Sequence, residues 1–248
     1  MFAFSAFAGK AYNVSSPDGK IKADISVGND LSYSVTFDGK PVISESTLSM
    51  TLSNGTIWGK NPKVAKVSKK SLNTKIPSPF YRADKLDENY NSTTINFKGG
   101  WGVEFRAYND GIAYRFISSQ KSPLIIADEE VCYNFPLDAT SFVPYTKSRD
   151  VDPYYNSFEN EYEEVKLSGI DRNRLIFLPM TVDLGDNVKV TVTESDLEQF
   201  PGLYMTGCGN TSLKGSHARY PKISKQGGHN NLQMEVKERE NFIAKTDG

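Results

Sequence analysis

The sequence predicts an all-β chain organised as a large antiparallel sandwich. Short segments that alternate apolar and polar residues recur along it, turn residues separate them, and helical periodicity is nearly absent. The 12 prolines and 19 glycines suit a chain with many turns. A propeller is the weaker alternative, because no repeat with a period of about 20 to 50 residues is found.

The first half of the chain is predicted to form successive hairpins. Turns rich in glycine, asparagine or aspartate, which tolerate positive φ, separate the alternating segments 21–27, 31–37 and 48–52. The clearest hairpin covers residues 103–116, with its turn at Asn109-Asp110-Gly111. One of its faces is apolar, and the other carries Glu104, Arg106, Ala113 and Arg115.

Residues 61–91 are less regular, because Pro62, Pro77 and Pro79 interrupt them, and we expect a long excursion between strands. Four lysines within this region form a basic cluster, which we interpret as a solvated edge strand that resists aggregation: Lys63, Lys66, Lys69 and Lys70. The chain carries 29 basic and 30 acidic residues, and this balance argues against nucleic-acid binding.

Three further strands are predicted near the C-terminal end, at 175–180, 188–193 and 232–236. At the other end, MFAFSAFAGK resembles the tail of a secretory signal peptide without its basic start. We therefore expect residues 1–10 to be a signal-peptide remnant, residues 11–248 to form one domain, and the protein to be periplasmic or secreted. No membrane span is predicted, because no apolar stretch approaches about twenty residues.

Cys132 and Cys208 belong to no C-x-x-C pair, so a thiolate zinc site is not expected. In an oxidising compartment they can form a disulfide, and two buried free thiols are the alternative.

Motifs of common enzyme classes are absent from the sequence, and no catalytic residue is predicted. His217 and His229 are the only histidines, without H-E-x-x-H spacing, a G-x-S-x-G elbow or a nucleotide-binding glycine loop. His217 can bind an anion or a sugar beside Arg219, but we favour a histidine in a surface loop. Glu159, Glu161 and Glu163 would share one strand face, where they could attract a cation, pair with arginines or lie in solvent.

Glu194 is the most informative candidate residue. Val190 and Val192 alternate with threonines as in a half-buried strand, and a turn follows, so Glu194 is placed at the strand end. A carboxylate there can reach a sugar hydroxyl, a cation or a neighbouring domain. The alternative interpretation is a solvated surface glutamate.

Five phrases, in order, resemble the amino-terminal domain of glycoside hydrolase family 97. They are SPDGKI (16–21), FRAYNDGIAYRF (105–116), ENEYEEVKLS (159–168), FLPMTVDL (177–184) and VTESDLEQFPGLYM (192–205). The resemblance implies a β-super-sandwich of the galactose-mutarotase-like kind, packed on a (β/α)8 catalytic barrel of the same polypeptide. It also implies exported bacterial enzymes that hydrolyse α-glucosides or α-galactosides and depend on calcium, with α-linked oligosaccharides as substrates. By the T-E-x-D-L phrase, Glu194 corresponds to the calcium ligand that the family's amino-terminal domain supplies.

The chain departs from the family at residues 242–248, where the barrel would begin, so the pair of catalytic carboxyl groups is expected to be missing. We therefore expect no glycoside hydrolysis by this chain alone. Three interpretations remain: part of a family 97 α-glycosidase, a stand-alone carbohydrate-binding module, or a structural interaction domain. In the second, aromatic side chains would stack on sugar rings, although core or interface positions are the favoured reading for them: Trp101, Tyr154, Tyr155 and Tyr204.

Overall fold

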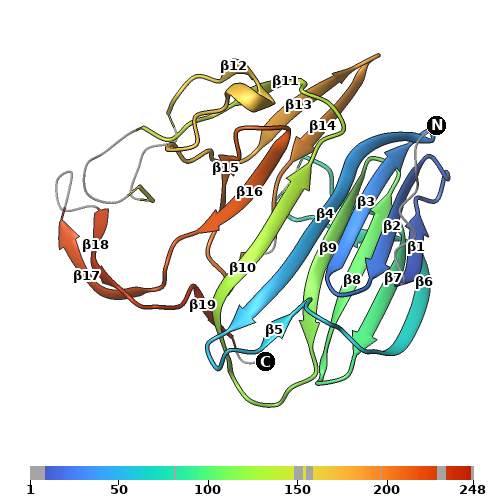
Figure 1. Cartoon of the computed structure of the whole chain (residues 1–248), viewed down its shortest axis with the longest axis horizontal. Coiled ribbons are helices and arrows are strands. Elements are labelled where there is room, and N and C mark those ends of the chain that lie inside the picture. Colours follow the sequence, from blue (N-terminus) through green and yellow to red (C-terminus); the bar gives the residue numbers. More distant parts are fainter. Residues whose placement is uncertain are drawn as a thin grey trace. The chain divides into compact units, whose positions relative to one another are not determined.

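A computed structural model describes residues 9–80, 82–147, 153–154, 159–195, 197–227 and 233–246, and these ranges are all-β (Figure 1). Within them, the helical structure consists of a single 3-10 turn, Leu167–Gly169. All strand pairs are antiparallel, which confirms the predicted fold class. In the described residues no helix is both long and apolar enough to cross a membrane.

The chain divides into two compact units. The first contains residues 1–45 and 59–121, and the second contains residues 46–58 and 122–248. Strand β4 (Lys40–Leu52) begins in the first unit and ends in the second. The expectation of one domain over residues 11–248 stays a prediction.

The first unit is a sandwich of two sheets. One sheet has the order β1 (Lys10–Ser15), β2 (Ile21–Val27), β3 (Leu31–Phe37) and the beginning of β4. The other has the order β6 (Val64–Pro77), β7 (Lys85–Phe97), β8 (Trp101–Tyr108) and β9 (Gly111–Ser118). Ile25, Ile95 and Phe105 are completely buried in this unit, as the alternating pattern of their strands requires. Between the sheets, Thr93 Oγ1 donates a hydrogen bond to the backbone carbonyl of Asn13 over 2.9 Å.

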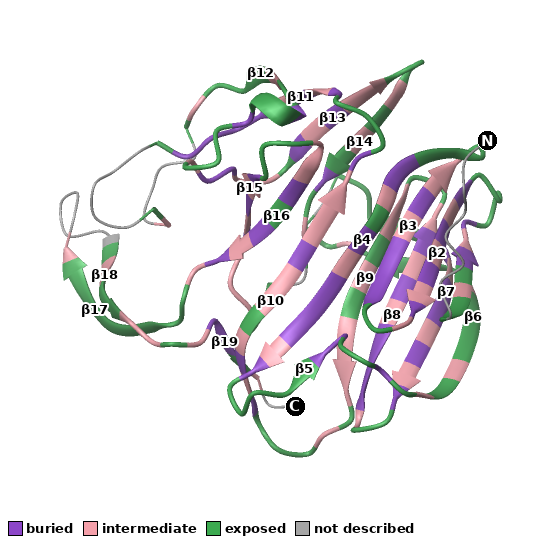
Figure 2. Cartoon of the chain, in the orientation of Figure 1, coloured by how far each residue is buried: buried purple, intermediate pink, exposed green. Residues whose placement is uncertain are grey.

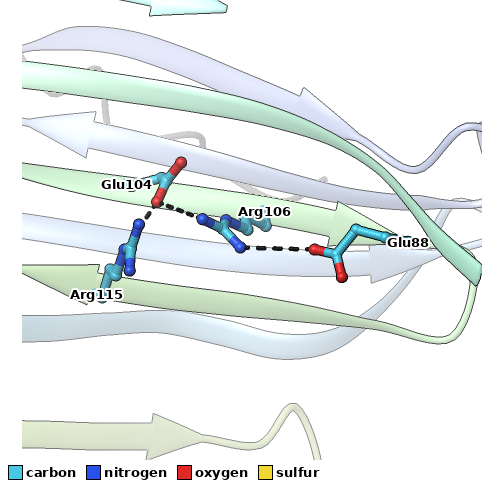
Figure 3. A network of polar contacts seen from close by, with 4 residues as sticks. All are labelled: Glu88, Glu104, Arg106 and Arg115. Carbon is cyan, nitrogen blue, oxygen red and sulfur yellow. Dashed lines mark hydrogen bonds and ion pairs between the residues drawn. The ribbon is translucent and has the colours of Figure 1, made fainter. Parts of the chain in front are cut away.

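The hairpin predicted at 103–116 is confirmed by β8 and β9. Its polar face carries a network in which Glu104 accepts hydrogen bonds from Arg115 at 2.8 Å and Arg106 at 3.2 Å (Figure 3). Arg106 also lies 3.9 Å from Glu88 of β7. The network therefore ties the polar sides of three neighbouring strands together.

The expected long excursion at 61–91 was wrong, because β6 and β7 form a long hairpin there. Pro62 precedes β6 and Pro77 is its last residue, so neither interrupts the ladder from within. The lysine-rich edge strand is confirmed, since β6 lies at the edge of its sheet and is mostly exposed (Figure 2).

The second unit also contains two sheets. One has the order β4 (its end), β10 (Leu124–Asn134), β16 (Ser212–His217) and β15 (Leu203–Gly207). Two short strands lie beside this path: β5 (Ile57–Trp58) pairs with β4, and β19 (Ala244–Thr246) pairs with β10. The other has the order β12 (Glu163–Lys166), β11 (Thr140–Val143), β13 (Met180–Gly185) and β14 (Val188–Val192). Strands β17 (Pro221–Gly227) and β18 (Gln233–Arg239) form a separate ribbon.

Two of the three later strand predictions are supported. Residues 188–193 correspond to β14, and 232–236 overlap β18, although Leu232 lies outside the described residues. The strand at 175–180 was wrong: Ile176 makes single bridges to Tyr145 and Met205, and only Met180 belongs to a strand. Pro179 has no N–H to donate, so a continuous ladder cannot form across it.

Candidate functional site

Glu194 lies two residues after β14, in the turn that leads to β15, so its predicted position at a strand end is confirmed. Both of its carboxylate oxygens accept a hydrogen bond from the backbone N–H of Leu203, at 2.8 and 2.9 Å. The side chain is half-buried. It is therefore held in one orientation by the first residue of β15, unlike a freely solvated glutamate.

Glu129 and His217 form a buried contact in the same unit, on neighbouring strands β10 and β16. His217 Nε2 lies 3.9 Å from Glu129 Oε2, and the two side chains are only 3% and 14% exposed, respectively. Among the described residues, the buried Nδ1 atom of His217 has no hydrogen-bond partner. The Phe200 ring covers the imidazole edge-on, with 5.5 Å between ring centres.

Burial shifts the pKa values of this cluster strongly. Burial, and then the negative charges of Asp128 and Glu194, raise the pKa of Glu129 to about 7. Burial lowers the pKa of His217 to about 4, against the opposing effect of Asp128. The neutral forms of both side chains are therefore favoured near pH 6, and their contact is not an ion pair there.

Burial also raises the pKa values of two nearby side chains. Burial raises the pKa of Glu194, although the hydrogen bond from Leu203 acts in the opposite direction. Burial raises the pKa of Tyr133 on β10 to about 12, and the charges of Glu129 and Glu194 add to this shift. Because the charge of Glu194 raises the pKa of both Glu129 and Tyr133, the three side chains share one environment, in which a positive charge near Glu194 would be stabilised.

Of these side chains, the Glu194 carboxylate has the chemistry of a calcium ligand. Calcium takes six to eight oxygen ligands, often carboxylates, and Glu194 offers an oriented carboxylate of this kind. Within the described ranges, no three histidine, cysteine, aspartate or glutamate side chains converge on one metal position. The described residues would therefore supply a minority of the ligands.

His217 was predicted to lie in a surface loop, and this was wrong. It is the last residue of β16, and Leu213 and Gly215 are buried at the alternate positions before it. The His217 side chain therefore lies on the same, buried side of the strand as Leu213. Because its neighbours in the sequence are polar, the sequence suggested a loop there and not the continuation of a strand. His229, the other histidine, lies outside the described residues.

The aromatic candidates differ in their surroundings. Trp101 is buried on β8 and stacks on Phe97 with 4.2 Å between ring centres, which confirms a core position. Tyr154 and Tyr204 are half-buried and contact each other edge-on at 5.3 Å. Tyr155 lies outside the described residues.

The acidic run at 159–163 makes a surface contact. Glu163 on β12 accepts a hydrogen bond from Arg174 at 3.0 Å, as the arginine-pairing alternative predicted. Glu159 and Glu161 precede the strand and are exposed.

Both cysteines are free thiols. Cys132 is half-buried on β10, but the expectation of two buried thiols was wrong for Cys208, which is exposed just after β15. The strand ends before it, so the Cys208 side chain lies outside the alternation of buried and half-buried positions in β15.

Sequence reasoning missed Glu129 and Tyr133. A usable signal was present, since Glu129, Val131 and Tyr133 follow one another at every second position and so share a strand face. The three consecutive acidic residues 128–130 concealed this pattern, because such a run suggests a solvated segment.

Comparison with known proteins defines the class to which this fold and site belong. The family model described as "Glycosyl-hydrolase 97 N-terminal" matches residues 14–237, and the chain belongs to this family. A retaining α-galactosidase of Bacteroides thetaiotaomicron is 51% identical over 245 residues, which cover 97% of this chain and 37% of the relative. The chain thus spans little more than a third of this relative's length.

Solved structures with low sequence identity share the fold. A glycoside hydrolase family 97 enzyme from Pseudoalteromonas sp. strain K8, in complex with acarbose, has a TM-score of 0.70 at 22% identity, covering 83% of this chain and 32% of that one. A β-arabinopyranosidase has a TM-score of 0.75 at 19% identity, covering 95% of this chain and 38% of that one.

Proposed function

We propose that this chain forms the N-terminal part of an exported α-glycosidase and acts on α-linked oligosaccharides together with a (β/α)8 barrel of the same polypeptide. The similarity to the retaining α-galactosidase over nearly the whole chain supports this proposal most strongly, and it favours galactosides over glucosides. Since that relative is much longer than this chain, the catalytic carboxyl groups are assigned to the barrel.

In this proposal, Glu194 is the residue that the chain contributes to a calcium ion shared with the barrel. The orientation of its carboxylate by Leu203 supports the assignment, because a preorganised ligand loses little freedom when a metal binds. The charge of Glu194 raises the pKa of both Glu129 and Tyr133, which supports a negative potential around Glu194. Calcium would supply a fixed positive charge at the sugar pocket and hold the two domains together.

The test compares the 248-residue chain with the polypeptide extended through the barrel. We expect the extended protein alone to hydrolyse 4-nitrophenyl α-galactoside. In that protein, Glu194→Gln should weaken calcium binding, measured by calorimetry, by about tenfold or more. Glu198→Gln is the matched control, because Glu198 is an exposed carboxylate in the same turn.

Two outcomes would overturn parts of the proposal. Unchanged calcium affinity in the Glu194→Gln protein would remove the ligand assignment. Hydrolysis by the 248-residue chain would instead place the catalytic groups within it. Sugar binding by a protein without a barrel would favour the stand-alone binding module, and a protein that binds neither sugar nor calcium would favour the structural domain.

A further inference from the structure

A cavity of about 630 Å³ opens in the second unit between β16 and strand β18 of the ribbon. Its volume lies within the range of about 300 to 1,000 Å³ that is typical of small-molecule sites. Nine of its lining residues carry charges or hydroxyl groups, among them Asp128, Tyr154, Lys214, Ser216, Arg219 and Arg239. Neither Glu194 nor Glu129 is among its described lining residues, but His217, which contacts Glu129, is one of them.

Two arginines of the cavity are held in place by backbone carbonyls. Arg219 donates from Nη1 to the carbonyls of Ala127 and Asn241, and Arg239 donates from Nη1 to the carbonyl of Arg219 at 2.6 Å. These contacts fix the guanidinium groups before any ligand binds, which reduces the entropic cost of recognition.

The charges around the cavity leave an excess of positive potential. Lys237 pairs with Glu235, and Glu238 pairs with Lys222 at 2.8 Å, so these lining charges are matched locally. Among the described residues, Lys214 and Arg219 form no ion pair. They give two cations against one carboxylate, Asp128, and this balance favours an anionic ligand.

Asp128 and the hydroxyl groups restrict the kind of anion. A carboxylate in the cavity repels a multiply charged phosphate, but it can accept hydrogen bonds from a ligand's hydroxyl groups. Tyr154 and Ser216 place two further hydroxyls 2.6 Å apart, and the Tyr154 ring offers a flat apolar surface. A ligand with one negative charge, several hydroxyls and an apolar ring face fits all these features.

We propose that this cavity binds a uronic-acid residue, with the sugar carboxylate at Lys214 and Arg219 and the sugar hydroxyls at Asp128, Tyr154 and Ser216. The site would let the protein recognise acidic branches or neighbouring units of a polysaccharide. The inference does not rest on the proposed glycosidase activity, because it requires only binding.

The test is calorimetric titration of the 248-residue chain with galacturonate, galactose and acetate at low salt. We expect galacturonate to bind with a dissociation constant of about 1 mM or tighter, and galactose and acetate to bind at least about tenfold more weakly. Lys214→Ala and Ser216→Ala should each weaken galacturonate binding, whereas Lys225→Ala, at an exposed lysine of the ribbon strand β17, should not.

Each other outcome contradicts the proposal in a defined way. Equal affinity for galactose would show that the carboxylate is not recognised, and equal affinity for acetate would leave a simple anion site. Absence of galacturonate binding by the folded chain, checked by circular dichroism, would exclude the site. None of these results would affect the calcium or hydrolysis tests.

Discussion

The imidazole Nε2 of His217 lies 3.9 Å from the carboxylate Oε2 of Glu129, and folding shifts the pKa values of these two buried groups in opposite directions. The pKa of Glu129 rises from 4.5 to about 7, and that of His217 falls from 6.5 to about 4. The folded state therefore favours a protonated glutamate beside an unprotonated histidine.

These shifts predict opposing effects of pH on stability. Between about pH 4.5 and 7 the folded state holds more protons at Glu129 than the unfolded state, so its contribution to stability falls as pH rises. Between about pH 4 and 6.5 the unfolded state holds more protons at His217, so that contribution rises with pH. In the unchanged chain the two contributions largely cancel from about pH 4.5 to 6.5.

Single substitutions should separate the two contributions. Relative to the unchanged chain, Glu129→Gln should gain stability from pH 4.5 to 6.5 and His217→Gln should lose it, each by about 2 to 3 kcal/mol. Urea unfolding at both pH values measures this difference. Parallel pH profiles for all three proteins would contradict the assigned pKa shifts.

Gly207 of β15 is predicted to tolerate no side chain. An added Cβ would lie 2.6 Å from Ile170 Cγ2 and 3.1 Å from the Ile170 carbonyl oxygen. Gly207→Ala should therefore destabilise the fold by about 1 to 3 kcal/mol, as overpacking does. Gly169→Ala is the control, because its Cβ would meet no atom within 4 Å. Equal urea midpoints for the two variants would show that Ile170 can move aside.

The Glu104 network should contribute more to stability than an exposed ion pair. The side chain of Glu104 is 14% exposed and accepts hydrogen bonds from two arginines, so Glu104→Gln should destabilise the chain by about 1 to 2 kcal/mol. For comparison, Asp87→Asn removes the pair with Lys75, in which both side chains are mostly exposed, and should cost less than about 0.5 kcal/mol. Thermal unfolding of both variants tests this order, and a reversed order would refute it.

The two thiols should differ in reactivity. Burial, followed by the proximity of Cys208, raises the pKa of Cys132, and Cys208 is exposed. With a chromogenic disulfide reagent at pH 8, we expect a fast phase from Cys208 and a phase from Cys132 that is at least about tenfold slower. Cys208→Ser should remove the fast phase and Cys132→Ser should leave it. A fast phase that persists in Cys208→Ser would contradict the difference in accessibility.

Much of the fold could be predicted because the signals that define it are local. The hairpin at 103–116 required only alternation and the turn Asn109-Asp110-Gly111, and the edge strand β6 required only its spaced lysines. The prediction failed at 61–91 and 175–180, where the effect of a proline depends on its position relative to the partner strand.

By itself the sequence determined the all-β class, most strands, the family and the place of Glu194 at a strand end, since periodicity and turn chemistry act over a few residues. Only the tertiary structure decided which side chains share a buried environment. Glu129, His217 and Glu194 are distant in the sequence, and they interact because β10 and β16 pair and Leu203 begins the adjacent β15. Burial and neighbouring charge, which set the protonation of these groups, exist only once those strands have assembled.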